Sequence, residues 1–353
     1  MDKTRGAQTH VNNKFLEYKH EVCTAFKNYC VLENEEPTTS STTYTRVFPK
    51  TFVNKVQSPD IGMQYSANPY QGCEHGCVYC YARNTHEYWG FGAGKDFEKQ
   101  ILYKANAPEL LNNFLKHKQW AGHTIVLSGN TDCYQPIERK LQITRQCLEV
   151  FLKWQHPVGI ITKNALILRD LDILKALAKK HCVSVTISVT TLNDHLRRVL
   201  EPRTATIKKR LEAIRKLSEA GIPVRVMVAP IIPGLTSHEI LPLVKTVAAH
   251  GAQEVLHTVV RLNGHIATIF TDWVEKAFPD RAQKIINQIK ACHSGSLNDS
   301  RWRTRMRGDG VLADQIALTM ALARKKYLKN IPQITPLESK HYRQLKNPQQ
   351  RLF

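Results

Sequence analysis

Short apolar runs rich in β-branched residues recur through the middle of the chain, and each is paired with a stretch of helical periodicity. The apolar runs cover residues 123–130, 156–162, 182–190, 222–230 and 254–262. The stretches with helical periodicity lie near 138–154, 166–180, 193–200, 205–220 and 237–250. Near-continuous apolar strands separated by helices are typical of βαβ units around a parallel sheet.

The segment 205–221 shows the helical pattern most clearly. Its apolar residues, Ile207, Leu211, Ile214 and Leu217, fall on one helical face, and the glycine at position 221 is suited to end the helix. This segment is therefore predicted to be an amphipathic helix that packs on the sheet.

One further strand is expected just before Cys73, which brings the number of parallel strands to about six. Six βα units favour a partial TIM-like (β/α)6 barrel, with a doubly wound sheet as the alternative. In both folds, functional side chains gather at the carboxyl ends of the strands.

The polar, weakly patterned start of the chain differs from this core. We predict an N-terminal extension over 1–58, a core domain over 59–300 and a basic C-terminal extension over 301–353.

Charge narrows the range of partners. The 353 residues include 50 Lys and Arg and 30 Asp and Glu, a net charge of +20, and the last 53 residues alone carry +9. Such a balance favours nucleic acid, a phosphorylated substrate or a membrane surface, although a solvated basic surface stays open. No apolar run is long enough to span a bilayer and the first residues lack an apolar signal core, so we expect a cytoplasmic protein without a membrane partner.

Three of the nine cysteines lie within eight residues, in the spacing Cys73-x3-Cys77-x2-Cys80. Clustered thiolates hold zinc or an iron–sulfur cluster. Zinc normally needs a fourth protein ligand, for which His75 is the candidate, whereas a 4Fe–4S cluster on three cysteines leaves one iron open to a small molecule. The glycines at 72 and 76 permit the tight turns that wrap a cluster.

An aromatic residue, Tyr79, precedes the third cysteine, and several characteristic sequence segments accompany the motif. They are GCEHGCVYCYAR (72–83), TDCYQPIE (131–138), TKNALILRDLD (162–172), LEPRT (200–204), APIIPG (229–234) and MRGDG (306–310). Over about residues 59–310 the sequence resembles radical S-adenosylmethionine (SAM) enzymes, in the branch related to spore photoproduct lyase.

The resemblance implies that Cys73, Cys77 and Cys80 bind a 4Fe–4S cluster whose open iron is chelated by SAM. In such enzymes the reduced cluster cleaves SAM to methionine and a 5′-deoxyadenosyl radical, which abstracts hydrogen from a substrate. It also implies an electron donor such as a flavodoxin or ferredoxin.

The resemblance further implies four SAM contacts at strand ends: Thr131, Asp132, Lys163 and Ser188. Each has an ordinary alternative, as a turn cap, a loop lysine or a strand serine. Glu201 and Arg203 either bind SAM or pair with each other, and the apolar segment 229–234 either forms a wall under the adenine or is a stiff turn.

The substrate stays open, with nucleic acid as one candidate. Spore photoproduct lyase has a catalytic cysteine at the end of the second strand, where this chain has Gly129 or Asn130, with Cys133 further along, so no catalytic residue is assigned. The arginine-rich segment 298–310 contains Trp302 and suits phosphate binding and base stacking, or else caps the barrel. The alternative function is a non-enzymatic nucleic-acid-binding protein that carries zinc or a cluster.

Overall fold

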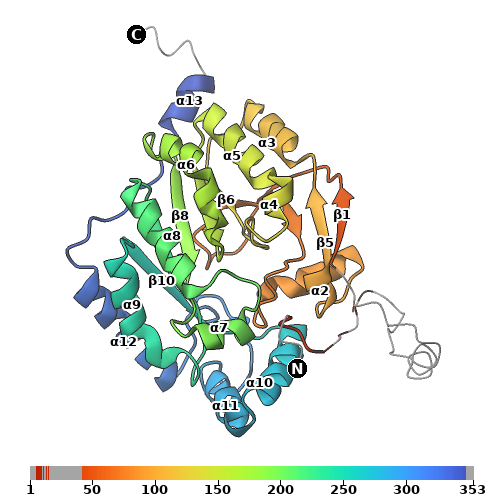
Figure 1. The fold of residues 1–353 in the computed structure, drawn as a ribbon, viewed down its shortest axis with the longest axis vertical. Helices are drawn as coiled ribbons and strands as arrows, with labels where there is room; N and C mark the ends of the chain where they lie inside the picture. The colour runs from red at the N-terminus through yellow and green to blue at the C-terminus, as the bar shows by residue number, and fades with distance from the viewer. Residues whose placement is uncertain (1–4, 10, 12, 14, 16–41, 347–353) are drawn as a thin grey trace, which may run out of the picture.

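The computed structural model describes residues 5–9, 11, 13, 15 and 42–346, and its centre is a seven-stranded sheet (Figure 1). The strand order is β10-β9-β8-β7-β6-β3-β2. The strands are β2 (Val53–Lys55), β3 (Tyr65–Ala67), β6 (Ile125–Leu127), β7 (Val158–Thr162), β8 (Val183–Ser188), β9 (Val224–Ile231) and β10 (Glu254–Val259). All neighbours pair in parallel except β2, which runs antiparallel to β3.

The order of the parallel strands decides between the two predicted folds. From β3 to β10 the strands lie side by side in the order in which the chain forms them. A doubly wound sheet would reverse that order at a switch point. The chain therefore forms the partial (β/α)6 barrel, and the predicted fold class is confirmed, with β2 and β10 at the two edges of the described sheet.

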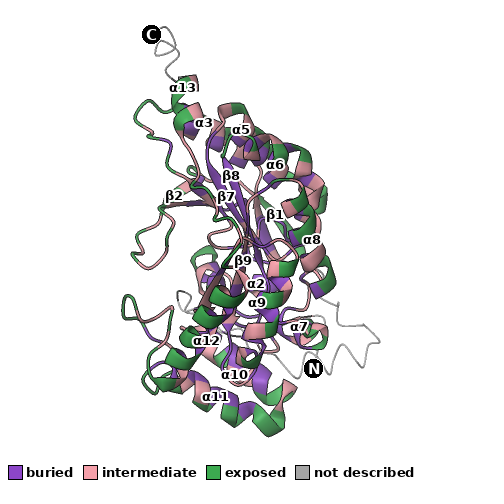
Figure 2. Cartoon of the chain, turned by 90° about the vertical axis from the view of Figure 1, so that its left-hand side faces the viewer, coloured by how far each residue is buried: buried purple, intermediate pink, exposed green. Residues whose placement is uncertain are grey.

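Helices cover the outer face of the strands. Figure 1 shows α5, α6 and α8 outside the barrel, and Figure 2 shows these helices on one side of the buried strands and loops on the other. The α-helices are α2 (Asp96–Lys99), α3 (Ala107–Lys116), α4 (Glu138–Leu141), α5 (Ile143–Trp154), α6 (Leu171–Ala178), α7 (Asp194–Leu200), α8 (Ile207–Glu219), α9 (Ile240–Ala249), α10 (His265–Ala277), α11 (Ala282–Ala291), α12 (Val311–Tyr327) and α13 (Lys340–Lys346). The 3-10 helices are η1 (Tyr81–Trp89), η2 (Ala165–Asp170), η3 (Ser237–Glu239) and η4 (Pro279–Arg281).

Three predicted helical stretches are interrupted, among them 237–250, which begins as the 3-10 turn η3 before α9. The stretch 138–154 is divided between α4 and α5 because Gln142 takes a left-handed conformation, with a φ of 52°. The stretch 166–180 begins as the 3-10 turn η2, capped by the Asn164 side chain that accepts a hydrogen bond from the Leu166 backbone. Apolar periodicity marks which face is buried, but it does not mark such breaks.

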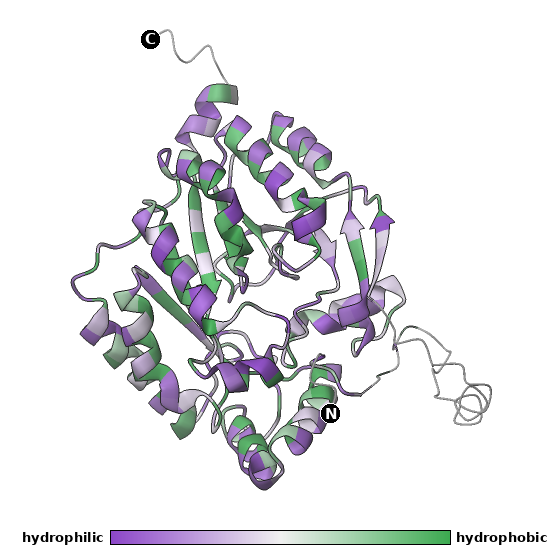
Figure 3. Cartoon of the chain, in the orientation of Figure 1, coloured by the Kyte–Doolittle hydropathy of each residue, from purple (hydrophilic) through white to green (hydrophobic). Residues whose placement is uncertain are grey.

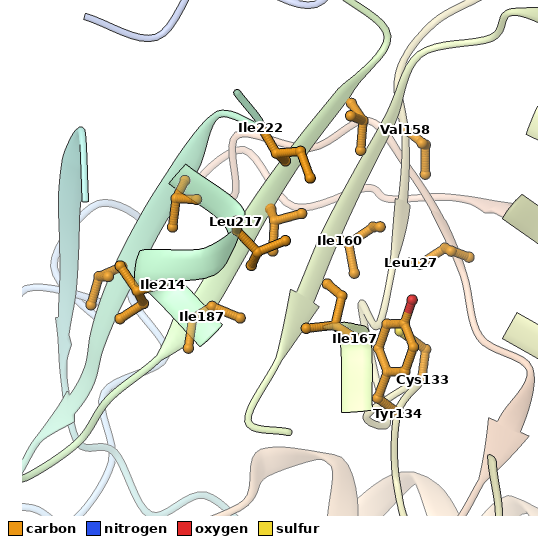
Figure 4. Packing of buried hydrophobic residues seen from close by; sticks show 14 of the residues in the cluster. Leu127, Cys133, Tyr134, Val158, Ile160, Ile167, Ile187, Ile214, Leu217 and Ile222 are labelled. Carbon is orange, nitrogen blue, oxygen red and sulfur yellow. The ribbon is translucent and has the colours of Figure 1, made fainter. Parts of the chain in front are cut away.

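Helix α8 illustrates how the sequence builds the core. Thr206 caps its first turn, and Gly221 follows its end with a φ of 74°. Of the four apolar residues on its predicted face, Ile207, Ile214 and Leu217 are buried and Leu211 is partly buried. Figure 4 shows Ile214 and Leu217 among the buried side chains of the strands, and Figure 3 shows the hydrophilic and hydrophobic stripes of the outer helices.

A smaller sheet lies beside the barrel and leads into the cysteine segment. Its order is β1 (Thr43–Val47), β5 (Gln100–Lys104), β4 (Tyr70–Gln71). Strands β1 and β2 both fall in the predicted N-terminal extension and pair with core strands, while the division into three segments remains a prediction. In the described part of the chain no helix is long and apolar enough to cross a membrane.

Replacing Leu217 by Ala should lower the free energy of unfolding by about 2–5 kcal/mol, because it leaves a cavity between α8 and the sheet. Urea unfolding measures this change. The exposed Lys208 on the same helix provides the control, since Lys208→Ala should shift the free energy by no more than about 0.5 kcal/mol. Equal effects of the two substitutions would contradict this packing.

Candidate functional site

A cavity of about 570 Å³ occupies the barrel and reaches the carboxyl ends of its strands. The structure places all seven predicted site residues in its lining. They are Cys73, Cys77 and Cys80 from the loop after β4, Thr131 and Asp132 after β6, Lys163 after β7, and Ser188 at the end of β8. Residues from four places along the chain thus face one space.

Backbone hydrogen bonds fix the path of the cysteine loop, residues 72–80. The amide of Cys73 donates to the Phe97 carbonyl at 2.7 Å, and the amide of Cys80 donates to the Cys77 carbonyl at 3.3 Å. Cys73 and Cys77 are buried, whereas Cys80 is partly exposed. The Val78 amide also donates to the Leu200 carbonyl at 3.2 Å, which attaches the loop to the end of α7.

Two glycines allow this path. Gly72 has a φ of 76°, and a Cβ there would lie 2.7 Å from the Gln100 carbonyl oxygen. Gly76 has a φ of 67°, and a Cβ there would lie 2.8 Å from a carboxylate oxygen of Glu98. Both the left-handed backbone and the close approach therefore require glycine, as the sequence predicted.

A support beneath the cysteine loop was not predicted from the sequence. Arg83 and Glu98 are fully buried and form an ion pair of 2.6 Å, and the Arg83 Nε donates to the Cys77 carbonyl at 3.0 Å. The backbone amides of Gly6 and Ala7 donate to the Glu98 carboxylate at 3.1 and 2.7 Å. The early segment of the chain thus packs directly under the loop, although no periodicity in residues 1–58 indicated it.

His75 does not complete a zinc site. Its Nδ1 lies 3.3 Å from the Asp132 carboxylate, and its Nε2 lies 3.4 Å from the Asn164 amide nitrogen. Burial alone would lower the pKa of His75, but Asp132 and Cys73 raise it to about 10. Among the described residues, no three His, Cys, Asp or Glu side chains converge as a single metal ion requires.

The donor set fits an iron–sulfur cluster instead. In an iron–sulfur cluster each cysteine thiolate binds a different iron atom. Three cysteines that do not converge on one point therefore suit a cluster better than a single metal ion. Burial raises the pKa of the Cys80 thiol to about 11, and burial together with Glu201 raises that of Cys77. Thiols in this environment ionise when a cation binds them.

Asp132 and Thr131 line the cavity but also bond to the protein. The Asp132 carboxylate accepts hydrogen bonds from the Thr162 hydroxyl and the Lys163 amide, both at 2.7 Å. Burial would raise the pKa of Asp132, but His75 and these donors lower it. The Thr131 hydroxyl donates to the Tyr70 carbonyl at 2.7 Å. These bonds match the turn-capping alternative, and direct ligand contact remains a prediction for both residues.

Lys163 is held by a buried anionic network. Its Nζ lies 3.9 Å from a carboxylate oxygen of Glu201 and 5.9 Å from the centre of the Tyr79 ring. Glu201 is fully buried and also accepts hydrogen bonds from Arg210, Tyr79 and Thr190. Burial would raise the pKa of Glu201, but Arg210 and Lys163 outweigh it and lower the pKa to about 2.

The suggested pair of Glu201 with Arg203 is wrong. Arg203 pairs with Glu74 at 3.1 Å, whereas Glu201 pairs with Arg210 at 2.5 Å. The short sequence separation of the first two residues misled the prediction, because Glu201 points toward α8 and the barrel interior.

Ser188 and the end of β9 also line the cavity. Ser188 is buried, and its hydroxyl makes no hydrogen bond to the described residues. Ala229 and Pro230 from the APIIPG segment also line the cavity and supply an apolar surface there.

Cys133 is fully buried and is not part of the cavity lining, whereas Tyr81 lines the cavity. The Tyr81 hydroxyl donates to the Gly129 carbonyl at 2.7 Å, two residues after the end of β6. Its position next to the third cysteine was the one signal that could have marked it.

Comparisons with known proteins agree with this geometry. The model of the Radical SAM superfamily matches residues 67–247. An uncharacterized protein of Mycobacterium tuberculosis is 34% identical over 241 residues, which cover 67% of this chain and 71% of that protein. The Radical SAM Nalpha-GlyT isomerase of Pseudomonas phage M6 is 27% identical over 234 residues, which cover 65% of this chain and 46% of the phage protein.

Solved structures show the same fold. Spore photoproduct lyase complexed with dinucleoside spore photoproduct superposes with a TM-score of 0.59 and 16% identity, over 81% of this chain and 79% of that chain. At this level of identity the likeness establishes the architecture and not the reaction.

Replacing Gly72 by Ala should abolish most of the iron binding, because the new Cβ meets a backbone carbonyl at 2.7 Å. Gly90→Ala is the matched control: Gly90 has a similar φ of 81° but no atom within 4 Å of its Cβ position. It should cost only the backbone strain of about 1–2 kcal/mol and keep its iron. Iron analysis after anaerobic reconstitution compares them, and equal iron loss in both would contradict the close approach.

The lowered pKa of Glu201 predicts a pH-dependent stability. At pH values above 4.5, the pKa of this carboxyl in the unfolded chain, its charge stabilises the fold by roughly 3 kcal/mol. This contribution disappears as the pH falls through about 2, the pKa in the folded protein. Glu201→Gln should therefore be less stable than wild type near neutral pH, by a difference that narrows toward pH 2. Urea unfolding of cluster-free protein measures it, with the exposed Glu109→Gln as control. A pH-independent difference would disprove the assignment.

Proposed function

Since this chain belongs to the Radical SAM superfamily and is a radical SAM enzyme, we propose which of its residues carry that chemistry. The three cysteines of the loop 72–80 hold the 4Fe–4S cluster, and four further residues bind SAM beside it: Thr131, Asp132, Lys163 and Ser188. When bound, the cluster supplies the electron that splits SAM into methionine and a 5′-deoxyadenosyl radical.

One observation carries this proposal: three thiols and an ammonium group face the same cavity. The Lys163 nitrogen lies 3.9 Å from the buried carboxylate of Glu201, and this separation leaves it able to pair with a ligand carboxylate on the cavity side. Glu201 and Arg210 act as positioning residues, because neither is exposed and both hold the surroundings of Lys163 in place.

The other SAM groups fit the remaining wall. The hydroxyl of Ser188 has no described partner, so it can bond to a ribose hydroxyl or a carboxylate. Ala229 and Pro230 give the adenine an apolar surface. The oxygens of Thr131 and Asp132 supply acceptors for the amine of SAM at the same strand ends.

We further propose an external one-electron donor such as a flavodoxin or ferredoxin, and a nucleic-acid or nucleotide substrate. The net charge of +20 supports an anionic substrate. The similar fold of spore photoproduct lyase, described in complex with a dinucleoside, supports the same class.

Anaerobic reconstitution with iron and sulfide tests the proposal. With reductant and SAM, the wild type should release 5′-deoxyadenosine slowly without substrate, as measured by chromatography. Cys77→Ala should lose both the brown colour and this product. Cys182 lies outside the cavity and donates to backbone carbonyls, so Cys182→Ser should keep both. A wild type that holds a full cluster but does not cleave SAM would refute the proposal.

Lys163→Ala should weaken SAM binding by about 1.5–3 kcal/mol, the loss of one charge-assisted hydrogen bond, without loss of iron. Equilibrium binding of labelled SAM to the reconstituted protein measures the change. Lys140→Ala, at an exposed position on α4, is the control and should bind as wild type does. Unchanged affinity in Lys163→Ala would remove this lysine from the SAM site.

A further inference from the structure

Two loops from opposite edges of the barrel meet over its open side. The loop that follows β2 includes residues 58–63, and the loop before α12 includes residues 301–307; together we call them the clasp. The Asp60 carboxylate accepts hydrogen bonds from the Arg303 amide at 2.8 Å and the Arg305 Nε at 2.7 Å. On the β10 side, the Val259 amide donates to the Met306 carbonyl at 3.0 Å.

The clasp borders the reaction cavity. Met63 from its first loop and Met306 from its second both line the cavity, together with Arg261 just after β10. A molecule that enters from this side therefore passes the clasp before it reaches the cysteine loop.

Positive charge is concentrated here beyond what the local acids neutralise. Arg305 pairs with Asp60, and Arg301 pairs with Asp299 and Asp309. The other two exposed arginines of the clasp, Arg303 and Arg307, form no ion pair with the described residues.

Arg261 adds an inward-facing cation. It is partly buried, lines the cavity and forms no ion pair with the described residues. Burial, together with the nearby charge of Arg305, lowers the pKa of Arg261 and outweighs the opposite effect of Asp60 and Asp299. A partly desolvated guanidinium that forms no direct ion pair favours an anionic ligand.

Trp302 supplies a flat apolar surface beside these charges. Its side chain is 53% exposed, and the Arg305 guanidinium lies 4.0 Å from the ring centre on one face. An exposed indole backed by arginine is suited to stack on a nucleobase.

The backbone holds this arrangement in place. Arg303 has a φ of 72°, a left-handed conformation that is unfavourable for a residue with a Cβ, and the Asp60 carboxylate accepts its amide hydrogen. Such conformations persist where the surroundings enforce them and are frequent at binding sites.

From these observations we infer that the clasp binds single-stranded nucleic acid and guides one base into the cavity. The phosphates contact Arg303, Arg307 and Arg261, and a neighbouring base stacks on Trp302. The inference rests on the proposed function and makes its substrate class specific. A cavity of about 570 Å³ enclosed by the barrel and the clasp accepts a base only outside a stacked duplex.

Other anionic partners fit less well. An acidic peptide would use the arginines but not the exposed indole, and a membrane surface would need a broader apolar patch than one tryptophan. Proteins that bind single-stranded nucleic acid combine arginine side chains, which bind phosphates, with exposed aromatic rings, on which bases stack.

Fluorescence anisotropy with the reconstituted holoenzyme tests the inference, using a labelled single strand and the same strand in a perfect duplex. The single strand should bind at least about tenfold more tightly. Arg303→Ala/Arg307→Ala should weaken single-strand binding, and the slope of log affinity against log salt should become shallower by about 0.7 for each phosphate that the variant no longer neutralises. Arg139→Ala/Lys140→Ala removes the same charge from exposed positions on α4 and should change neither quantity.

Trp302→Ala provides a second, uncharged test. Single-strand affinity should fall about 5- to 150-fold with little change in salt slope, and Trp302→Phe should recover part of it. The inference is overturned if the duplex binds as tightly as the single strand, if polyglutamate or anionic vesicles compete equally with it, or if the α4 control loses as much affinity as the clasp variant.

SAM cleavage by the wild type without nucleic acid separates the two proposals. A wild type that cleaves SAM but does not bind the single strand overturns this inference alone. A wild type that binds the single strand but holds a cluster without cleaving SAM overturns the proposed function.

Discussion

The cysteine loop depends on an ion pair that does not face the cavity. Arg83 and Glu98 are both fully buried, and apart from their mutual ion pair they bond to backbone groups. The arginine donates to the carbonyls of Cys77, Ala93 and Gly94, and the glutamate accepts the amides of Gly6 and Ala7. A buried pair of this kind is tolerated only when its remaining donors and acceptors are satisfied, and loss of one partner typically costs about 3–5 kcal/mol. The loop is therefore held by bonds on the side that faces away from the cavity, and these bonds do not involve the three sulfur atoms.

A second buried carboxylate with charged partners lies at another wall of the cavity, where it positions a side chain and not a backbone loop. Glu201 is as buried as Glu98, but its partners include a lysine that reaches the cavity. Arg210 contacts the carboxylate at 2.5 Å, whereas the Lys163 nitrogen lies 3.9 Å from it and also borders the cavity. One buried pair thus shapes a backbone loop, and the other orients a side-chain charge toward the ligand.

Much of this arrangement was predictable, because strands and local motifs leave signals in neighbouring residues. The five apolar runs overlap β6 to β10, and the strand-end positions of Lys163 and Ser188 follow directly from those runs. The missed interactions join distant positions: Gly6 with Glu98 over 92 residues, and Asp60 with Arg305 over 245. No periodicity encodes such pairings, and the arginine-rich segment could be interpreted either as a cap or as a binding surface until its partner loop was known.

The clasp controls access to the cavity, but the pairing of the barrel strands does not depend on it. The two edges of the sheet are bridged by side chains of Asp60 and Arg305 and by one backbone hydrogen bond to Met306, rather than by a continuous ladder of strand pairing. Lengthening or shortening either loop would resize the entrance without disturbing any parallel strand pair. A change in these two loops can therefore alter which molecules enter the cavity while the residues at the strand ends keep their positions.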